Sequence, residues 1–363
     1  MRQRSSARAY PHWMSASSEP RYLRQLRAIA LGKAPKLSAD AIKQHYVPSF
    51  LIARWATPKT RKGTLTQLNV TSGAVASCKA GKVATEPELY TIDAGTSSSD
   101  RSIEALLGLF ETSAAEPIKN LASFPATISD DDRLTIAMFL AFQQGRTPAG
   151  LAEHLHVAHM AVEASLHQFF GDREKVTAYV RARINPDAGA EDVKTWAASE
   201  IRGFKSGARF IEMPPEAPFQ AMLKSVTPVA SSVAMLDWTL LESARGEFVT
   251  NDRGLAMHDP DLRDGQGHAW STSSRAETTF PVAPNACLKL TPGNAGFSVQ
   301  QATADEVIEI NLRSYGWADE VIFGTNAATV EGVRQSALTD PTKVVKPRVP
   351  KWTGDVTFRA TSP

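Results

Sequence analysis

The spacing of apolar residues changes twice along the chain, and this change constrains the fold more than any other feature. Near the N-terminus and in the last third, short apolar or β-branched runs alternate with Gly, Pro, Asn and Asp, which is typical of strands and turns. Between about residues 100 and 236, apolar residues recur at intervals of three and four, as in amphipathic helices. Because an isolated hairpin needs a third strand, the sequence predicts an α+β fold. Its N- and C-terminal segments share an antiparallel sheet, with a large helical middle region between them.

Individual elements follow from turn residues and helix caps. The alternation after Gly63 and the turn at Ser72-Gly73 predict a hairpin over 63–80. The run from Ser129 to Asp132 is typical of a helix start, and Pro148 ends or kinks the helix that follows. Further strands are expected at 89–92, 238–241, 248–250, 278–282, 287–290 and 321–324, and further helices at about 103–114, 151–170, 173–184, 190–202, 219–226 and 305–317.

The chain is expected to have three regions: a basic flexible arm at 1–38, a single α+β domain at 39–336 with a helical insertion at about 100–236, and an extended tail at 337–363. Residues 1–37 hold eight Lys or Arg residues against one Glu, although the whole chain has a net charge of +2. An arm of this kind can bind the phosphates of nucleic acid or a nucleotide. The alternative is a solvated tail without a partner.

Composition indicates an ordinary soluble protein. The 363 residues are 42% hydrophobic and 21% charged, and no apolar run reaches the roughly 18 to 20 residues that cross a bilayer. The N-terminal residues lack the apolar centre of a secretory signal, so we expect a cytoplasmic protein without a membrane partner. Cys78 and Cys287 lie far apart and predict buried thiols rather than a disulfide or a metal knuckle.

Standard catalytic and metal-binding motifs are absent from the sequence. It contains no phosphate-binding G-x-x-x-x-G-K-[ST] loop, no G-x-S-x-G nucleophile elbow and no H-E-x-x-H zinc motif. His156, His159, Glu163 and His167 fall in one sector of a predicted helix, but their spacing matches no standard zinc site. We interpret this row as a solvated polar face, and the sequence identifies neither a cofactor nor a set of metal ligands.

Three short segments combine residue types that an ordinary core segment does not need. They are Gln44-His45-Tyr46-Val47-Pro48-Ser49-Phe50, Gln143 to Pro148 and Phe248 to Asp252. On these segments, in this order, the chain resembles the bacterial domain-of-unknown-function family 4238 over roughly residues 43–324. The resemblance implies no settled reaction.

The first segment offers His45, whose charge changes near neutral pH and which the resemblance favours as a functional residue. The alternative is a satisfied core histidine. Gln44 points to the opposite face from His45 if the segment is extended, and it converges with His45 on one substrate only if the backbone turns, which Pro48 makes plausible.

The second segment places Gln143 and Arg146 three residues apart near the end of a helix, followed by Thr147. A guanidinium suits a phosphate or carboxylate because it donates two parallel hydrogen bonds. We therefore consider Gln143 and Thr147 as substrate-binding residues and Arg146 as a charge clamp. The alternative is that Arg146 pairs with Glu104 or Glu111 and holds two helices together.

The third segment ends in Asp252, a carboxylate at the end of a predicted strand, where catalytic groups and turn-forming residues are both common. Family members resemble T-S-D-N-P here, whereas this chain reads Thr250-Asn251-Asp252-Arg253-Gly254. We therefore give Asp252 more weight than its neighbours. Asn311, on the last predicted helix, is a further candidate for substrate binding.

The leading functional hypothesis is a hydrolase acting on a phosphate-containing substrate, such as a nuclease or nucleotide-degrading enzyme in bacterial defence or toxin systems. His45, Arg146 and Asp252 would supply the acid or base, the charge clamp and the carboxylate that phosphodiester cleavage needs. The alternative is a non-enzymatic module that binds a ligand or partner. The substrate, the metal requirement and the oligomeric state stay open at this point.

Overall fold

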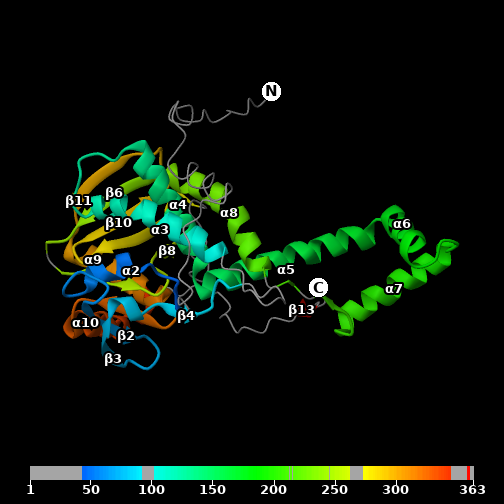
Figure 1. Ribbon diagram of the computed structural model, residues 1–363, viewed down its shortest axis with the longest axis horizontal. Coiled ribbons are helices and arrows are strands. Elements are labelled where there is room, and N and C mark those ends of the chain that lie inside the picture. Colours follow the sequence, from blue (N-terminus) through cyan, green and yellow to red (C-terminus); the bar gives the residue numbers. More distant parts are fainter. Residues whose placement is uncertain are drawn as a thin grey trace. The chain divides into compact units, whose positions relative to one another are not determined.

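The computed structural model describes residues 43–91 and 102–344, apart from positions 212, 215, 245 and 262–272, and the backbone of residues 358 and 359 (Figure 1). The predicted basic arm at 1–38 lies outside the described residues. The described chain forms two compact units. The first contains residues 43–91, 102–144 and 226–344, and the second contains residues 145–225 with 358–359.

The first unit contains a four-stranded antiparallel sheet in the order β3-β2-β12-β7. Its strands are β2 (Thr64–Asn69), β3 (Val75–Lys79), β7 (Thr250–Asn251) and β12 (Val321–Gly324). The β2–β3 hairpin is the predicted one, and β2 pairs with β12 from the far end of the sequence. The prediction that N- and C-terminal segments share an antiparallel sheet is therefore confirmed.

The second sheet of this unit has five strands in the order β11-β6-β10-β9-β8. They are β6 (Asp237–Glu242), β8 (Ala256–His258), β9 (Glu277–Ala283), β10 (Ala286–Thr291) and β11 (Phe297–Gln301). Its pairs are antiparallel except β11 with β6, which run parallel. A separate short pair joins β1 (Lys43–His45) to β4 (Thr85–Pro87).

Two predicted strands differ from the structure. The strand expected at 89–92 lies earlier, as β4, and residues 88–90 form a turn that buries Tyr90. Of the strand expected at 248–250, only Thr250 is part of a strand, in β7. The backbone N–H groups of Phe248 and Val249 form hydrogen bonds with groups that are not in a neighbouring strand. Phe248 N donates to Pro284 O at 2.7 Å, and Val249 N donates to the side chain of Asn311 at 2.9 Å.

The helices of the first unit begin mostly where the sequence predicts. They are α2 (Ser49–Ile52), η2 (Ala53–Trp55), η3 (Ala80–Lys82), α3 (Ser102–Leu121), α4 (Asp130–Arg146), α8 (Ala217–Ala234), α9 (Ala304–Trp317), α10 (Ala327–Thr339) and η5 (Pro341–Lys343). Of these, α4 ends in the second unit and α8 begins there. The hydroxyl of Ser129 accepts from Asp132 N at 3.1 Å, so Ser129 caps α4 as expected.

Helix α10 was not predicted, and it continues past residue 336, where the extended tail was expected to begin. Its buried residues Val330, Val333 and Ala337 recur at helical spacing, and they face the sheet that contains β2 and β12. Figure 1 shows α10 beside β2 and β3, although these elements come from opposite ends of the described sequence. The apolar face of α10 therefore completes the core that the shared sheet begins.

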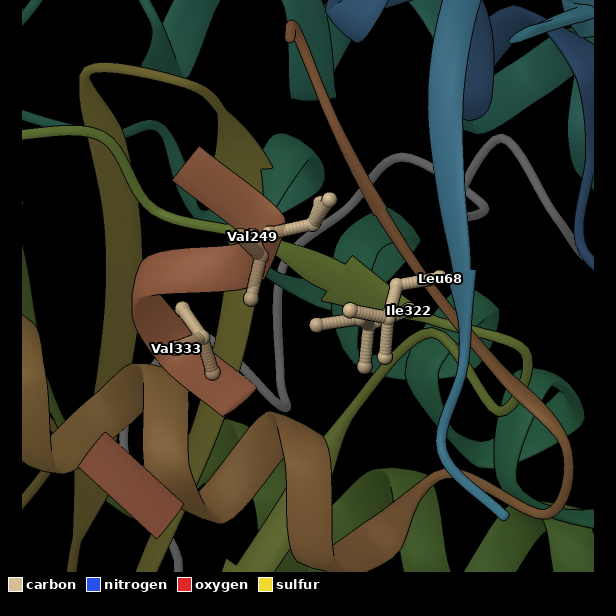
Figure 2. Packing of buried hydrophobic residues seen from close by; sticks show 5 residues of the cluster. Leu68, Val249, Ile322 and Val333 are labelled. Carbon is tan, nitrogen blue, oxygen red and sulfur yellow. The ribbon is translucent and has the colours of Figure 1, made fainter. Parts of the chain in front are cut away.

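The core of the first unit lies between its sheets and the last helices. Figure 2 shows Leu68 and Ile322, from neighbouring strands, in one cluster with Val249. Val333, from α10, belongs to the same cluster. A second cluster joins Leu241, Phe248 and Cys287 to Val307 and Ile310 of α9. Cys287 is buried as predicted, whereas Cys78 is partly exposed.

Arg133 is a buried cation of this core with several backbone partners. Its guanidinium donates to the carbonyls of Ala234 and Leu236 at 3.1 Å each and of Gly296 at 2.7 Å. It also lies 4.6 Å from the ring centre of Trp238. These contacts attach α4 to the end of α8 and to the five-stranded sheet.

The second unit is largely helical. It contains α5 (Pro148–Gly171), α6 (Arg173–Arg183), α7 (Ala190–Ser206) and β5 (Phe210–Ile211), which pairs with β13 (Phe358–Arg359). Val176, Val180 and Val193 form its apolar centre, against which Phe169, Phe170 and Trp196 pack. Among the described residues, no helix has both the length and the apolar character needed to cross a membrane.

Candidate functional site

The side chain of Gln143 connects the three segments that stood out in the sequence. From α4, its amide Nε2 donates to the backbone carbonyl of Tyr46 at 3.0 Å and to that of Arg253 at 3.1 Å. Trp55, in the turn after the first segment, donates its indole N–H to Phe248 O at 2.7 Å. These buried bonds hold the first and third segments against each other, which gives Gln143 a structural role.

Gly254 shows how closely Gln143 is packed. Its φ is +79°, in the left-handed region that favours glycine. A Cβ atom there would also lie 3.2 Å from Nε2 of Gln143. The turn after Asp252 therefore needs glycine both for its backbone conformation and for the contact with the amide.

Asp252 holds the start of β12. Its carboxylate is 2% exposed and accepts from three consecutive backbone N–H groups, those of Asp319 at 2.8 Å, Glu320 at 2.7 Å and Val321 at 3.0 Å. Burial and the nearby Asp319 carboxylate raise the pKa of Asp252 to about 7, while the three N–H donors act in the opposite direction. The geometry gives Asp252 a structural role, and a catalytic role stays a prediction.

The residues beside Asp252 also have defined partners, although only Asp252 was singled out in the sequence analysis. Asn251 donates to Ser314 O at 3.0 Å and accepts from Arg253 N at 3.0 Å. The buried guanidinium of Arg253 pairs with Asp319 at 2.9 Å and lies 5.4 Å from the ring centre of Trp317. Both neighbours therefore support the same turn that Asp252 holds.

Three of the predicted substrate-binding residues bond to the protein itself. Gln44 accepts from Tyr90 N at 2.5 Å and donates to Glu104 Oε2 at 2.7 Å. Asn311 accepts from Val249 N and donates to Glu247 O at 2.8 Å. Thr147 caps α5 by accepting from Gly150 N at 3.1 Å. These contacts explain the residue types without a ligand.

The predicted catalytic residues come from different parts of the structure. His45 lies on β1, paired with Thr85, and Asp252 lies in the same unit. Arg146 is the buried last residue of α4 and belongs to the second unit. Within the first unit, Gln143 joins the first and third segments, and the catalytic roles of His45, Arg146 and Asp252 stay predictions.

No metal centre emerges from the described residues, among which no group of three or more His, Cys, Asp or Glu side chains could hold a metal ion. In the histidine row of α5, His159 is buried whereas His156 and His167 are exposed. The row is thus not one uniform face.

A pocket of about 460 Å³ lies beside the first segment, in the first unit. Its walls come from the ends of β1 and β4, the β2–β3 hairpin and the start of β12. The lining residues are Tyr46, Gln67, Ser77, Cys78, Lys79, Lys82, Val83, Ala84, Thr85, Glu320 and Val321. Gln143 bonds to the backbone of Tyr46 and Asp252 to that of Glu320 and Val321, so the segments singled out in the sequence hold two walls of this pocket.

The strand register gives the pocket two different ends. Lys79 pairs with Thr64 at the start of β2, whereas Glu320 bonds to Val70, just past its end. Six residues of strand separate these positions along β2, which corresponds to about 20 Å between backbones at roughly 3.4 Å per residue. Long side chains shorten this distance, but Lys79 and Glu320 still enter the pocket from opposite ends.

The Tyr46 phenol belongs to the acidic end. Burial raises its pKa above the ordinary tyrosine value, and the charges of Asp252, Glu320, Glu86 and Asp319 raise it further. Burial and Glu320 also raise the pKa of Glu86. The phenol therefore keeps its proton at neutral pH and can donate a hydrogen bond. Burial likewise raises the pKa of the Cys78 thiol, which makes it a poor nucleophile.

Ala84 adds a strained backbone to the pocket wall. Its φ is +50°, which is unusual for a residue other than glycine, and its carbonyl accepts from Tyr46 N at 3.0 Å. Such conformations persist where surrounding contacts impose them, and they are frequent at ligand sites.

Sequence reasoning missed Tyr46, Lys79, Lys82 and Glu320 as site residues. Tyr46 was within reach, because it is the only hydroxyl-bearing aromatic in the first segment. The other three lie in stretches with no motif, and they line one pocket only because β2 pairs with both β3 and β12.

Comparisons with known proteins give one match. Residues 43–328 match the family described as Protein of unknown function (DUF4238). No curated protein and no solved structure matches the chain.

Proposed function

The chain belongs to the family of proteins of unknown function DUF4238, and we propose that it is a binding module for a nucleotide-sized molecule. The ligand would carry a phosphate at one end and N–H donors, such as those of a base, at the other. One observation carries this proposal: the Tyr46 pocket has Lys79 at one end and a carboxylate with a protonated phenol at the other, and Lys82 also lines it.

The volume and lining of the pocket support a ligand of this class. At about 460 Å³ it falls within the roughly 300 to 1,000 Å³ that small-molecule sites occupy. Lys79 and Lys82 are exposed, and neither forms an ion pair with a described carboxylate, so both ammonium groups can reach an anion. Glu320 can accept from the N–H groups of a base.

Binding is favoured over the hydrolase hypothesis because two of the predicted site residues, Gln143 and Asp252, bond to the backbone. The amide nitrogen of Gln143 and the carboxylate of Asp252 bond to the backbone, which suits a rigid frame for a pocket. The frame keeps the walls in place, and the lining residues then recognise the ligand.

Titration calorimetry of the full chain with guanosine monophosphate, adenosine monophosphate and inorganic phosphate tests the proposal. Replacing both lysines, Lys79→Gln with Lys82→Gln, should weaken nucleotide binding at least tenfold, because each charge-assisted bond contributes about 1.5 to 3 kcal/mol when well formed. Lys119→Gln, at an exposed lysine of the same unit, should leave affinity unchanged. Undetectable binding of both nucleotides by the unmodified chain would overturn the proposal.

A second pair of variants tests the acidic end. Tyr46→Phe removes only the hydroxyl and should weaken binding about fivefold, in line with roughly 1 kcal/mol for a neutral hydrogen bond. The matched control is Tyr315→Phe, whose hydroxyl donates to Val70 O at 3.1 Å and does not line the pocket. Equal losses in the two variants would show that the Tyr46 hydroxyl does not contact the ligand.

Hydrolysis of the bound nucleotide is a second candidate, favoured by the same acidic end. The Tyr46 phenol could donate a hydrogen bond to the leaving oxygen, which takes its proton from solvent, and Glu320 could accept a proton from the attacking water. Chromatography of nucleotide incubated with the protein checks this reading. Glu320→Gln should then bind but release no product, and recovery of unchanged nucleotide from the unmodified protein would leave binding alone.

A further inference from the structure

We infer that the ligand of the Tyr46 pocket is one nucleotide of a single-stranded nucleic acid, whose phosphate backbone lies on a basic patch beside the pocket. This inference rests on the proposed function and adds the class of ligand. The basic patch consists of Lys59, Arg61, Lys62, Lys79 and Lys82, all of which are exposed.

The sequence around the patch carries positive charge only. Residues 43–85 contain seven Lys or Arg residues and no Asp or Glu, although the whole chain is nearly balanced at 40 basic and 38 acidic residues. A charge separation of this kind within one folded segment produces a local positive potential. Phosphates that bind there release counterions, which stabilises the complex at low salt.

Backbone hydrogen bonds bring the two parts of the patch together. Gly81 N donates to Arg61 O at 2.8 Å, and Ala80 N donates to Gly63 O at 3.0 Å. These bonds place the loop 57–63 against η3, which follows Lys79 and ends at Lys82. The loop cations Lys59, Arg61 and Lys62 therefore extend the line of charge that begins at the pocket.

The loop is also tightly built, so it presents its cations in a defined place. Thr57 and Thr64 exchange backbone hydrogen bonds at 2.8 and 3.0 Å across its base. A Cβ atom on Gly63 would lie 1.8 Å from Pro58 O, so only glycine fits there. A preorganised loop loses less conformational entropy when it binds a strand.

A single strand fits this arrangement better than a duplex. A pocket of about 460 Å³ has room for one base, and a base enters such a pocket only when it is unpaired. The neighbouring phosphates of the same strand would then follow the loop cations. A free nucleotide would use the pocket but would not reach these cations.

The test compares the full chain with a patch variant that carries Lys59→Gln, Arg61→Gln and Lys62→Gln. The probe is a fluorescein-labelled poly-thymidine strand of about 16 nucleotides, the upper end of common single-strand site sizes. Loss of three phosphate contacts should reduce the salt slope by about 2, at roughly 0.7 per contact. Raising salt from 50 to 200 mM should then weaken the unmodified chain roughly twenty-fold more than the variant.

The control variant removes three other exposed cations of the first unit, each ion-paired with a carboxylate, and so changes the net charge equally. Its substitutions are Lys119→Gln, Arg275→Gln and Lys343→Gln. Its salt slope should match that of the unmodified chain. Equal slope changes in the two triple variants would overturn the inference, because net charge alone would then explain binding.

Calorimetry with guanosine monophosphate separates this inference from the proposed function. The patch variant should bind the mononucleotide as the unmodified chain does. If no mononucleotide binds but strand binding still depends on the loop cations, the pocket proposal fails and the patch stands. No strand binding by the unmodified chain, an unchanged salt slope in the patch variant, or tighter binding to duplex than to the single strand refutes the inference.

Discussion

Replacement of Asp252 tests most directly how the hydrogen bonds of its carboxylate support the pocket wall. Asp252→Ala removes a buried acceptor that three consecutive N–H groups share. A net value of about 1 to 1.5 kcal/mol per hydrogen bond gives a destabilisation of about 3 to 4.5 kcal/mol at pH 7. Asp252→Asn keeps one acceptor oxygen but turns an amide N–H₂ toward a donor, so we expect about half that loss.

The loss of stability should be accompanied by a loss of binding. The three N–H groups belong to the segment that places Glu320 and Val321 in the pocket wall, and without the carboxylate this segment is free to move. Nucleotide affinity should therefore fall in Asp252→Ala even under conditions in which the variant is fully folded.

Asp237 provides the matched control for this effect. Its carboxylate accepts from Asn294 N at 3.0 Å and Gly296 N at 2.7 Å, so it also holds a turn, but one outside the pocket. Asp237→Ala should destabilise the protein and leave nucleotide affinity unchanged. The comparison thus separates general loss of stability from loss of the pocket wall.

Urea unfolding followed by circular dichroism and tryptophan fluorescence gives the stabilities, and calorimetry gives the affinities. A change below about 0.5 kcal/mol for Asp252→Ala, as for an ordinary surface substitution, would refute the reasoning. So would equal loss of nucleotide binding in Asp252→Ala and Asp237→Ala.

Three further predictions follow from the same hydrogen bonds and charges. Gln143→Glu replaces a donor to two backbone carbonyls with a carboxylate and should lower the free energy of unfolding by about 3 kcal/mol or more, against little change for the exposed Gln335→Glu in urea titrations. Arg133→Met leaves three carbonyls without their donor and should lower the free energy of unfolding by about 3 to 5 kcal/mol. An unchanged transition in calorimetric melting would contradict this. The folded-state pKa of Asp252 is about 7, above its unfolded value, so the carboxyl keeps its proton to a higher pH in the folded protein than in the unfolded chain. The stability that this proton binding contributes is therefore lost as pH rises from about 4 to 7. Relative to Asp252→Asn, the unmodified protein should therefore lose about 1.4 kcal/mol per pH unit in that range, and a pH-independent difference between the two would contradict this sign.

Local patterns in the sequence determined most of the secondary structure. The Ser129 cap, the helix boundary at Pro148 and the hairpin over 63–80 depend on residues within a few positions of each other, and each is present in the structure. The pairing of β2 with β12 followed from a general rule, because short hairpins at both ends need further strands. Helix α10 was missed although Val330, Val333 and Ala337 carry the helical period.

The roles of the motif residues were decided only by the tertiary structure. Gln143 bonds to carbonyls 97 and 110 residues away, and Asp252 bonds to N–H groups of residues 319–321. Amides and carboxylates serve equally well as ligand contacts and as partners of the backbone, so residue type does not distinguish the two uses. The pocket likewise depends on strand register, which brings Lys79 and Glu320 to its opposite ends. Sequence periodicity records which face of an element is buried, but which distant backbone groups that element meets is fixed only when the whole chain packs.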